Sequence, residues 1–159
     1  MLYFAYGSNL NWEQIKKRVP SSSFHGIAKL ENYRLDFTRK SANRGCGVAD
    51  IVKDKNKDVW GAIYQFNKKD LKKLDECEGY NPNRENEKNA YIRIEKMVYL
   101  EGKKDQSMTV YTYEVIDKEF GKHKPNKEYK NRIVTGAKYW KLPKEYIKYL
   151  ENIETIKDK

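Results

Sequence analysis

The segment that decides the fold lies at the start of the chain and reads Tyr3-Phe4-Ala5-Tyr6-Gly7-Ser8-Asn9-Leu10. Its apolar and aromatic residues over 2–6 predict a β-strand that breaks at the glycine. The Gly-Ser-Asn turn that follows lets the backbone approach a ligand closely, and backbone amides in such a turn can hold an anion or an oxyanion. The same residues also suit an ordinary strand-to-helix connection in which Asn9 closes an Asx-turn, so the segment alone leaves both interpretations open.

Beyond this segment the chain mixes helix-forming and strand-forming stretches. Asn11, with Gln14 three positions on, is a predicted N-cap of a short helix that ends near Pro20. Short β-branched or aromatic runs separated by turn residues predict strands near 23–30, 33–38, 47–52, 58–66, 91–100 and 107–115. Further helices are predicted from Asn67 to Gly79, around 127–138 and from Pro143 onward, and the polar residues 80–90 predict a mobile lid. Because the strands outnumber the helices and lie in neighbouring runs, we expect an α+β fold, a small mixed β-barrel flanked by a few α-helices.

The composition is that of a small, basic, globular protein. The 159 residues carry 33 Lys and Arg against 23 Asp and Glu, a net charge of +10. Lysines mostly alternate with acids, as over 53–58, which is typical of a solvated surface rather than of a nucleic-acid interface. No run approaches the roughly 20 apolar residues that span a bilayer, and the isolated Cys46 and Cys77 suit a reducing compartment. We therefore expect a cytoplasmic protein, without nucleic-acid or membrane partners, that forms one domain over 1–159.

The predicted helix that follows Asn67 carries a carboxylate on its apolar face. At 100° per residue Glu78 lies between the directions of Leu71 and Leu74, the apolar stripe of this helix. Burial and the partially negative C-terminal end of the helix both predict a raised pKa for this carboxyl group, as general acid/base catalysis near neutral pH requires. Asp75 falls within the same half of the helix, and Glu78 would equally suit a solvated helix end, so this geometry leaves the choice open.

A residue of the same helix also allows a second class of enzyme. A cysteine hydrolase would pair Cys77 with His25 or His123. The carboxylate next to Cys77 disfavours a thiolate there, and a lone helical cysteine more often serves packing.

Several stretches together carry a resemblance to a known family. Tyr6-Gly7-Ser8-Asn9-Leu10 after an N-terminal strand, followed by Leu74-Asp75-Glu76-Cys77-Glu78-Gly79, resembles the γ-glutamyl cyclotransferase-like (AIG2-like) family. Other stretches agree in order and spacing, namely Val59-Trp60-Gly61, Tyr91-Ile92-Arg93-Ile94-Glu95, Pro125-Asn126-Lys127-Glu128-Tyr129-Lys130, Gly136-Ala137 and Leu142-Pro143-Lys144-Glu145-Tyr146. The resemblance covers about residues 2 to 153.

The resemblance implies both a reaction and a set of site residues. It implies a small mixed barrel that converts a γ-glutamyl amino acid or γ-glutamyl amine into 5-oxoproline and a free amine, without cofactor or metal. It assigns general acid/base catalysis to Glu78 rather than Asp75. It assigns binding of the small γ-glutamyl substrate to Tyr3, Phe4, Ala5, Tyr6, Gly7, Ser8, Asn9, Leu10 and Tyr129.

Two points stay open within this resemblance. Residues 80–90 form a longer loop than the family has, and that loop borders the expected site. The leaving amine could be an α-amino acid, the ε-amine of a lysine crosslink or another γ-glutamyl metabolite. The alternative function is a non-catalytic small-molecule binding module of the same fold, because fold alone does not dictate function.

Overall fold

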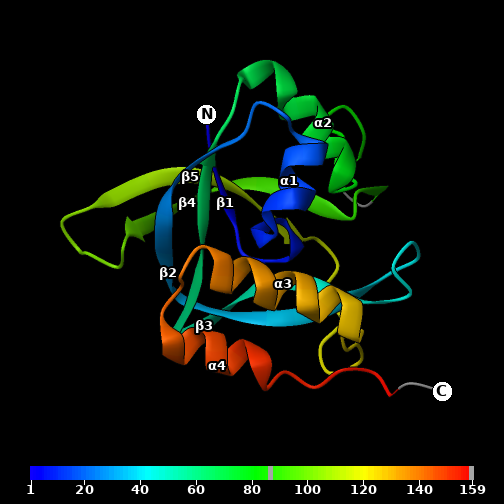
Figure 1. The fold of residues 1–159 in the computed structure, drawn as a ribbon. Helices are drawn as coiled ribbons and strands as arrows, with labels where there is room; N and C mark the ends of the chain where they lie inside the picture. Colours follow the sequence, from blue (N-terminus) through cyan, green and yellow to red (C-terminus); the bar gives the residue numbers. More distant parts are fainter. Residues whose placement is uncertain (86–87, 158–159) are drawn as a thin grey trace.

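A computed structural model describes residues 1–85 and 88–157 and shows five strands closed into a barrel (Figure 1). The strands follow the order β1-β3-β2-β4-β5 around the barrel. Their bounds are β1 Leu2–Ala5, β2 Ser23–Ser41, β3 Cys46–Gln65, β4 Tyr91–Leu100 and β5 Ser107–Val115. Neighbours pair antiparallel except β1 and β5, which close the barrel with a parallel pairing of Tyr3 opposite Tyr111. The mixed barrel predicted from the sequence is confirmed.

Strands β2 and β3 are longer than the sequence predicts. Segments 23–30 and 33–38 were expected as separate strands, and so were 47–52 and 58–66, but each pair is one continuous strand. The register shifts where Glu31 pairs with Asp58 and Tyr33 pairs with Lys53, so 54–57 bulge opposite Asn32. Asn32 and Asn56 adopt positive φ angles of 63° and 68°, which asparagine tolerates better than most residues. The polar residues there mark a bend in a two-stranded ribbon rather than the end of a strand.

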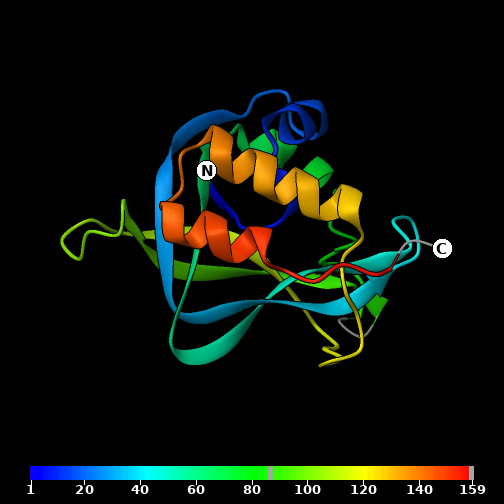
Figure 2. The same ribbon diagram turned by 60° about the horizontal axis from the view of Figure 1, so that its bottom comes forward.

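The helices lie outside the barrel. Their bounds are η1 Ser8–Leu10, α1 Trp12–Arg18, η2 Lys68–Asp70, α2 Leu71–Cys77, α3 Lys127–Tyr139 and α4 Lys144–Glu151, where η marks a 3₁₀ helix. Asn11 caps α1 as predicted, because its Oδ1 accepts the Gln14 N–H at 3.1 Å, and Asn126 caps α3 in the same way. The Asn67 side chain makes no capping hydrogen bond, since a 3₁₀ turn separates it from α2. Figures 1 and 2 show α3 and α4 side by side along one side of the barrel, with α1 and α2 together at another.

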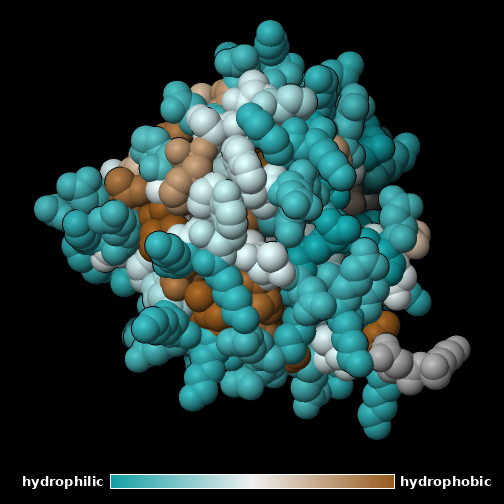
Figure 3. Space-filling view, viewed as in Figure 1, coloured by the Kyte–Doolittle hydropathy of each residue, from teal (hydrophilic) through white to brown (hydrophobic). Residues whose placement is uncertain are grey.

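Helix α3 packs directly onto the turn that follows β1. A Cβ atom at Gly136 would overlap the backbone of Leu10, so only glycine permits this contact. Leu10 and Ile133 are almost completely buried. The face that carries α3 and α4 is mostly hydrophilic, with apolar residues gathered between these two helices (Figure 3). Among the described residues, every helix is too short or too polar to cross a bilayer.

Candidate active site

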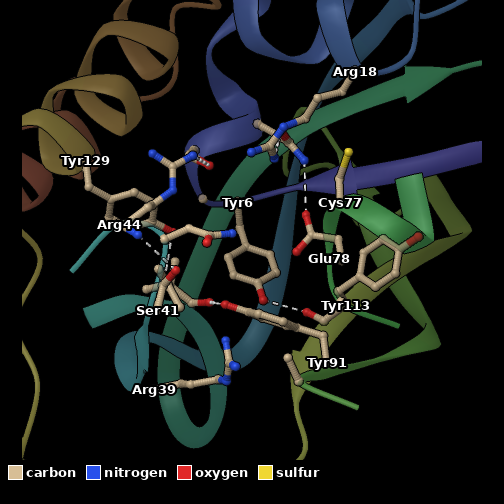
Figure 4. Close-up of a pocket in the computed structure, with 18 of the residues that line it drawn as sticks. Tyr6, Arg18, Arg39, Ser41, Arg44, Cys77, Glu78, Tyr91, Tyr113 and Tyr129 are labelled. Carbon is tan, nitrogen blue, oxygen red and sulfur yellow. Dashed lines mark hydrogen bonds between the residues drawn. The ribbon is translucent and has the colours of Figure 1, made fainter. Parts of the chain in front are cut away.

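A cavity of about 280 Å³ opens where the start of the chain meets the end of α2, the turn between β2 and β3, and the start of α3 (Figure 4). Its size suits a small metabolite. The residues that border it are Tyr3, Tyr6, Gly7, Ser8, Asn9, Arg18, Arg39, Ser41, Ala42, Asn43, Arg44, Val48, Ala49, Glu76, Cys77, Glu78, Gly79, Ala90, Tyr91, Tyr113 and Tyr129.

Glu78 stands at the point where α2 ends. Its N–H donates to the carbonyl oxygens of Leu74 (3.0 Å) and Asp75 (3.1 Å), and Gly79 then turns the chain with a φ of 64°. The half-buried Glu78 directs its carboxylate into the cavity, where Oε1 accepts a hydrogen bond from Asn9 Nδ2 at 3.1 Å (Figure 4). Burial raises the pKa of this carboxyl group, while the positive charges of Arg18 and Arg44 partly offset the rise. The predicted catalytic carboxylate therefore faces the cavity with the predicted direction of pKa shift.

Asp75 has a different role, although it lies on the same half of α2. It is 5% exposed and does not border the cavity. Its Oδ1 accepts the Tyr113 hydroxyl at 2.6 Å, and its Oδ2 pairs with the Arg93 guanidinium. Both partners belong to the β4–β5 hairpin, so Asp75 fastens α2 to the barrel. The structure thus separates two carboxylates that helix periodicity leaves equivalent.

The loop after β1 divides between cavity and core. Tyr3, Tyr6, Gly7, Ser8 and Asn9 border the cavity. Three other predicted binding residues, Phe4, Ala5 and Leu10, are fully buried in the core and do not border the described cavity. Their assignment to substrate binding stays a prediction. In the structure these three residues pack in the core beneath the loop that borders the cavity.

Asn9 organises the polar wall of the cavity. Its amide nitrogen donates to Glu78 and to the Tyr3 hydroxyl at 3.0 Å. Its Oδ1 accepts hydrogen bonds from Gln14 Nε2 (2.9 Å) and Arg18 Nη1 (3.0 Å). The Asn9 carbonyl accepts the Tyr64 hydroxyl at 2.7 Å. With all these groups satisfied, the side chain that orients Glu78 has one fixed position.

Tyrosine hydroxyls form the opposite wall. Tyr129, predicted from the resemblance, accepts the Ala49 N–H at 2.9 Å, so its own proton stays available to a ligand. The Tyr91 hydroxyl donates to the Ala49 carbonyl at 2.7 Å, and the Tyr6 hydroxyl donates to the Tyr113 carbonyl. Burial raises the pKa of Tyr129 to about 12, and it raises those of Tyr6 and Tyr91 as well. These phenols therefore remain protonated near neutral pH and shape the cavity rather than act as bases.

Gly7 brings the backbone against this wall. A Cβ atom at position 7 would stand 3.1 Å from Ala49 Cβ and 3.5 Å from the Tyr129 hydroxyl. The turn hydrogen bonds run from Leu10 N–H to the Gly7 carbonyl and from Asn11 N–H to the Ser8 carbonyl, both at 3.0 Å. The amides of Gly7 and Ser8 come before the first donors of this 3₁₀ turn, so the turn itself does not use them.

Comparison with known proteins identifies the family. A sequence model of the AIG2-like family matches residues 58–150. The chain belongs to the AIG2-like family. A γ-glutamylcyclotransferase from Bos taurus is 36% identical to this AIG2-like chain over 157 residues, and one from Homo sapiens is 37% identical over 158. Each alignment covers 96% of this chain and 78% of the relative.

A solved structure described as a γ-glutamyl cyclotransferase superimposes on this AIG2-like chain with a TM-score of 0.88 and 36% identity. The superposition covers 99% of this chain and 90% of that one. The prediction of a cyclotransferase enzyme with a small mixed barrel is confirmed.

The AIG2-like chain carries cavity residues that sequence analysis did not single out. Arg18, Arg39 and Arg44 place three guanidinium groups around the cavity, which is also bordered by the two carboxylates of Glu76 and Glu78. Arg44 lies in the turn between β2 and β3, from which it donates to Gln14 and stacks over the ring of Tyr129. Gln14, which sequence analysis named only for its capping-box position in α1, does not border the cavity but turns its side chain toward the cavity residues Ser8 and Asn9. The arginines come from separate elements and share no motif.

The cysteine-hydrolase alternative finds no support in this AIG2-like site. Cys77 borders the cavity, but burial raises the pKa of its thiol, whereas a reactive cysteine needs a lowered pKa. Neither His25 nor His123 borders the cavity, and His123 contacts Glu119 at 3.1 Å instead. Within residues 1–85 and 88–157, no cluster of three or more His, Cys, Asp or Glu side chains could hold a metal ion.

The long loop 80–90 of this AIG2-like chain is fastened at its base. The Ala90 N–H donates to the Gly79 carbonyl at 3.1 Å, and Arg84 donates to the same carbonyl at 2.9 Å. Asn89 is 7% exposed, and its Oδ1 accepts the Asn81 N–H at 3.0 Å. Residues 86 and 87 of the predicted lid lie outside the described residues, and the lid stays a prediction.

Proposed function

We propose that the chain converts a small γ-glutamyl compound into 5-oxoproline and a free amine, with Glu78 moving the proton between the two amines. One observation carries this proposal. Glu78 is the cavity carboxylate that a loop side chain, Asn9, holds in place at 3.1 Å, while its neighbour Asp75 is occupied by Arg93 and Tyr113.

The first step removes a proton from the α-ammonium group of the γ-glutamyl unit. Glu78 accepts this proton, and the raised pKa of its carboxyl group brings that pKa closer to the pH at which the transfer runs. The free amine then attacks the γ-carbonyl carbon of the same unit, and a C–N bond closes the five-membered ring. Because both reacting atoms belong to one molecule, the site has only to hold the substrate bent.

The attack places a negative charge on the former carbonyl oxygen. The amides of Gly7 and Ser8 are suited to stabilise this oxyanion, because Gly7 brings them against the cavity without competing side-chain volume. Protonated Glu78 then gives its proton to the departing nitrogen as the original amide bond breaks. The ring nitrogen still carries one proton more than the lactam of 5-oxoproline holds, and this second proton passes to the free leaving amine. Two protons of the α-ammonium group thus end on the leaving amine, which departs as an ammonium ion, and Glu78 returns to its carboxylate form.

The cavity charges also support a carboxylate-bearing substrate. The α-carboxylate of the γ-glutamyl unit stands on the same carbon as the amine that meets Glu78. Arg18 donates to Asn9, and its charge lowers the pKa of Glu78, so its guanidinium is suited to bind that carboxylate (Figure 4).

The test is a turnover assay with purified protein. The wild type is incubated with a panel of γ-glutamyl amino acids and γ-glutamyl amines, and 5-oxoproline is followed by mass spectrometry. Glu78→Gln should lose turnover, because the amide keeps the shape and the Asn9 contact but cannot accept the proton. Glu76→Gln is the matched control, since Glu76 is exposed at the cavity mouth and no described side chain holds it.

Two results would contradict the proposal in different ways. Failure of the wild type to form 5-oxoproline from every substrate of the panel would refute the activity. Near-normal turnover by Glu78→Gln would leave the activity intact but remove Glu78 from it.

A further inference from the structure

The three arginines of the cavity differ in how they are engaged. Arg18 donates to Asn9 at 3.0 Å. Arg44 donates to Gln14 at 3.0 Å and its guanidinium lies 4.8 Å from the ring centre of Tyr129. Arg39 is half-buried, yet in the described parts of the chain no hydrogen bond or ion pair engages its guanidinium. A partly desolvated guanidinium without an anion is unfavourable, and a bound carboxylate would satisfy it.

The position of Arg39 is set by β2. It pairs with Val48 of β3 just after a register shift between Phe37 and Arg39, two residues before the strand ends. Figure 4 shows its guanidinium on the far side of Tyr91 from Glu78 and Arg18. Arg39 therefore meets a different part of a bound molecule from the part that meets Glu78.

A second cavity, of about 320 Å³, is also bordered by Arg39. It shares Arg39 and Ala90 with the first cavity and is otherwise bordered by polar residues, Lys40, Lys88, Asn89, Asp117 and Glu119. Arg39 thus borders both cavities.

We propose that Arg39 binds a carboxylate carried by the leaving amine and so selects γ-glutamyl amino acids over γ-glutamyl amines. This inference rests on the proposed function. Ring closure keeps the α-amine, the α-carboxylate and the attacked carbonyl within one compact unit beside Glu78. The leaving amine is then the part of the substrate that projects away from Glu78, and Arg39 is the uncommitted cation on that side.

The test compares two substrates that differ only in the carboxylate, γ-glutamylalanine and γ-glutamylethylamine. Arg39→Gln should lower kcat/KM for γ-glutamylalanine about 10- to 100-fold, the worth of a hydrogen bond between charged groups, mainly through a higher KM. It should leave kcat/KM for γ-glutamylethylamine within about twofold of wild type. Arg39→Lys should recover part of the loss, because it restores the charge but not the bidentate geometry. Lys53→Gln, which removes an exposed cation on β3 that borders neither cavity, controls for net charge.

The outcomes separate the two proposals. An equal fall for both substrates, or no fall for either, would overturn the role of Arg39 while leaving the cyclotransferase activity in place. Absence of 5-oxoproline from both substrates with wild-type enzyme would overturn the proposed function and this inference together. Thermal melting of each variant shows whether an equal fall comes from loss of folded protein.

Discussion

Replacing Asp75 with asparagine removes the charge that fastens α2 to the β4–β5 hairpin and leaves Glu78 in place. The asparagine oxygen can still accept the Tyr113 hydroxyl, but its amide nitrogen would face the Arg93 guanidinium, donor against donor. The lost contact is a hydrogen bond between charged groups, worth about 1.5–3 kcal/mol. The Arg93 side chain is 21% exposed, so water partly replaces the carboxylate and the cost stays near the middle of that range, about 2–2.5 kcal/mol.

For a chain of this length, a loss of about 2–2.5 kcal/mol lowers Tm by roughly 4–10 °C. Differential scanning calorimetry at pH 8 should show this fall for Asp75→Asn, and the folded fraction should keep most of its kcat. Glu78→Gln should behave in the opposite way. In the wild type, the raised pKa of Glu78 means that the folded state binds the proton more tightly than the unfolded state. The ionised carboxylate therefore destabilises the folded state, and this destabilisation grows as the pH rises through the folded-state pKa. Glu78→Gln should therefore melt no lower than wild type at pH 8 while losing turnover. If Asp75→Asn kept its Tm and lost kcat, the division of roles between the two carboxylates would be wrong.

Three further changes probe the site. Arg18→Gln removes a cation that lowers the pKa of Glu78. The acid limb of the pH profile of kcat/KM rises as Glu78 ionises, so this limb should move to higher pH in the variant. A limb that stayed in place would argue against Glu78 as the base. Tyr129→Phe leaves the buried Ala49 N–H without its acceptor, which should lower the free energy of unfolding in urea by about 1–3 kcal/mol and raise KM. An unchanged urea midpoint and KM would contradict a role for the Tyr129 hydroxyl in stability and substrate binding. Gly136→Ala drives a methyl group into the backbone of Leu10 and should destabilise the chain by about 1–3 kcal/mol with a loss of kcat, and wild-type values for both would show that α3 does not position the loop.

Local signals predicted local structure well. Asn11 caps α1 as expected because the N-cap hydrogen bond joins residues three apart, within reach of sequence inspection. The strands predicted near 91–100 and 107–115 also match β4 and β5, because each is a run of β-branched and aromatic residues bounded by turn residues. The mostly charged residues 53–57 resemble the end of a strand, so the sequence predicts two strands there, whereas residues 54–57 bulge opposite Asn32 within the continuous strand β3.

The site shows where sequence patterns stop. Periodicity placed Glu78 and Asp75 on one face of the helix, and the groups that distinguish them belong to β4 and β5. Arg93 lies 18 residues beyond Asp75, and Tyr113 lies 38 residues beyond it. Only the family resemblance favoured Glu78 over Asp75 as the catalytic residue before the structure was considered. Neither helix periodicity nor the family resemblance pointed to Arg39, because its proposed role depends on its place in a cavity that several elements form together.

The parallel pairing of β1 with β5 has a consequence for how the chain folds. Thr112 donates to the Phe4 carbonyl across a separation of 108 residues, and Tyr6 reaches Tyr113 across 107. Contacts this distant in sequence require a large loop to close before they contribute, which slows folding relative to local contacts. During synthesis on the ribosome, the loop that follows β1 emerges before β5 and has no barrel to close until β5 has also left the exit tunnel. We expect the first ten residues to remain among the last to become protected from hydrogen exchange.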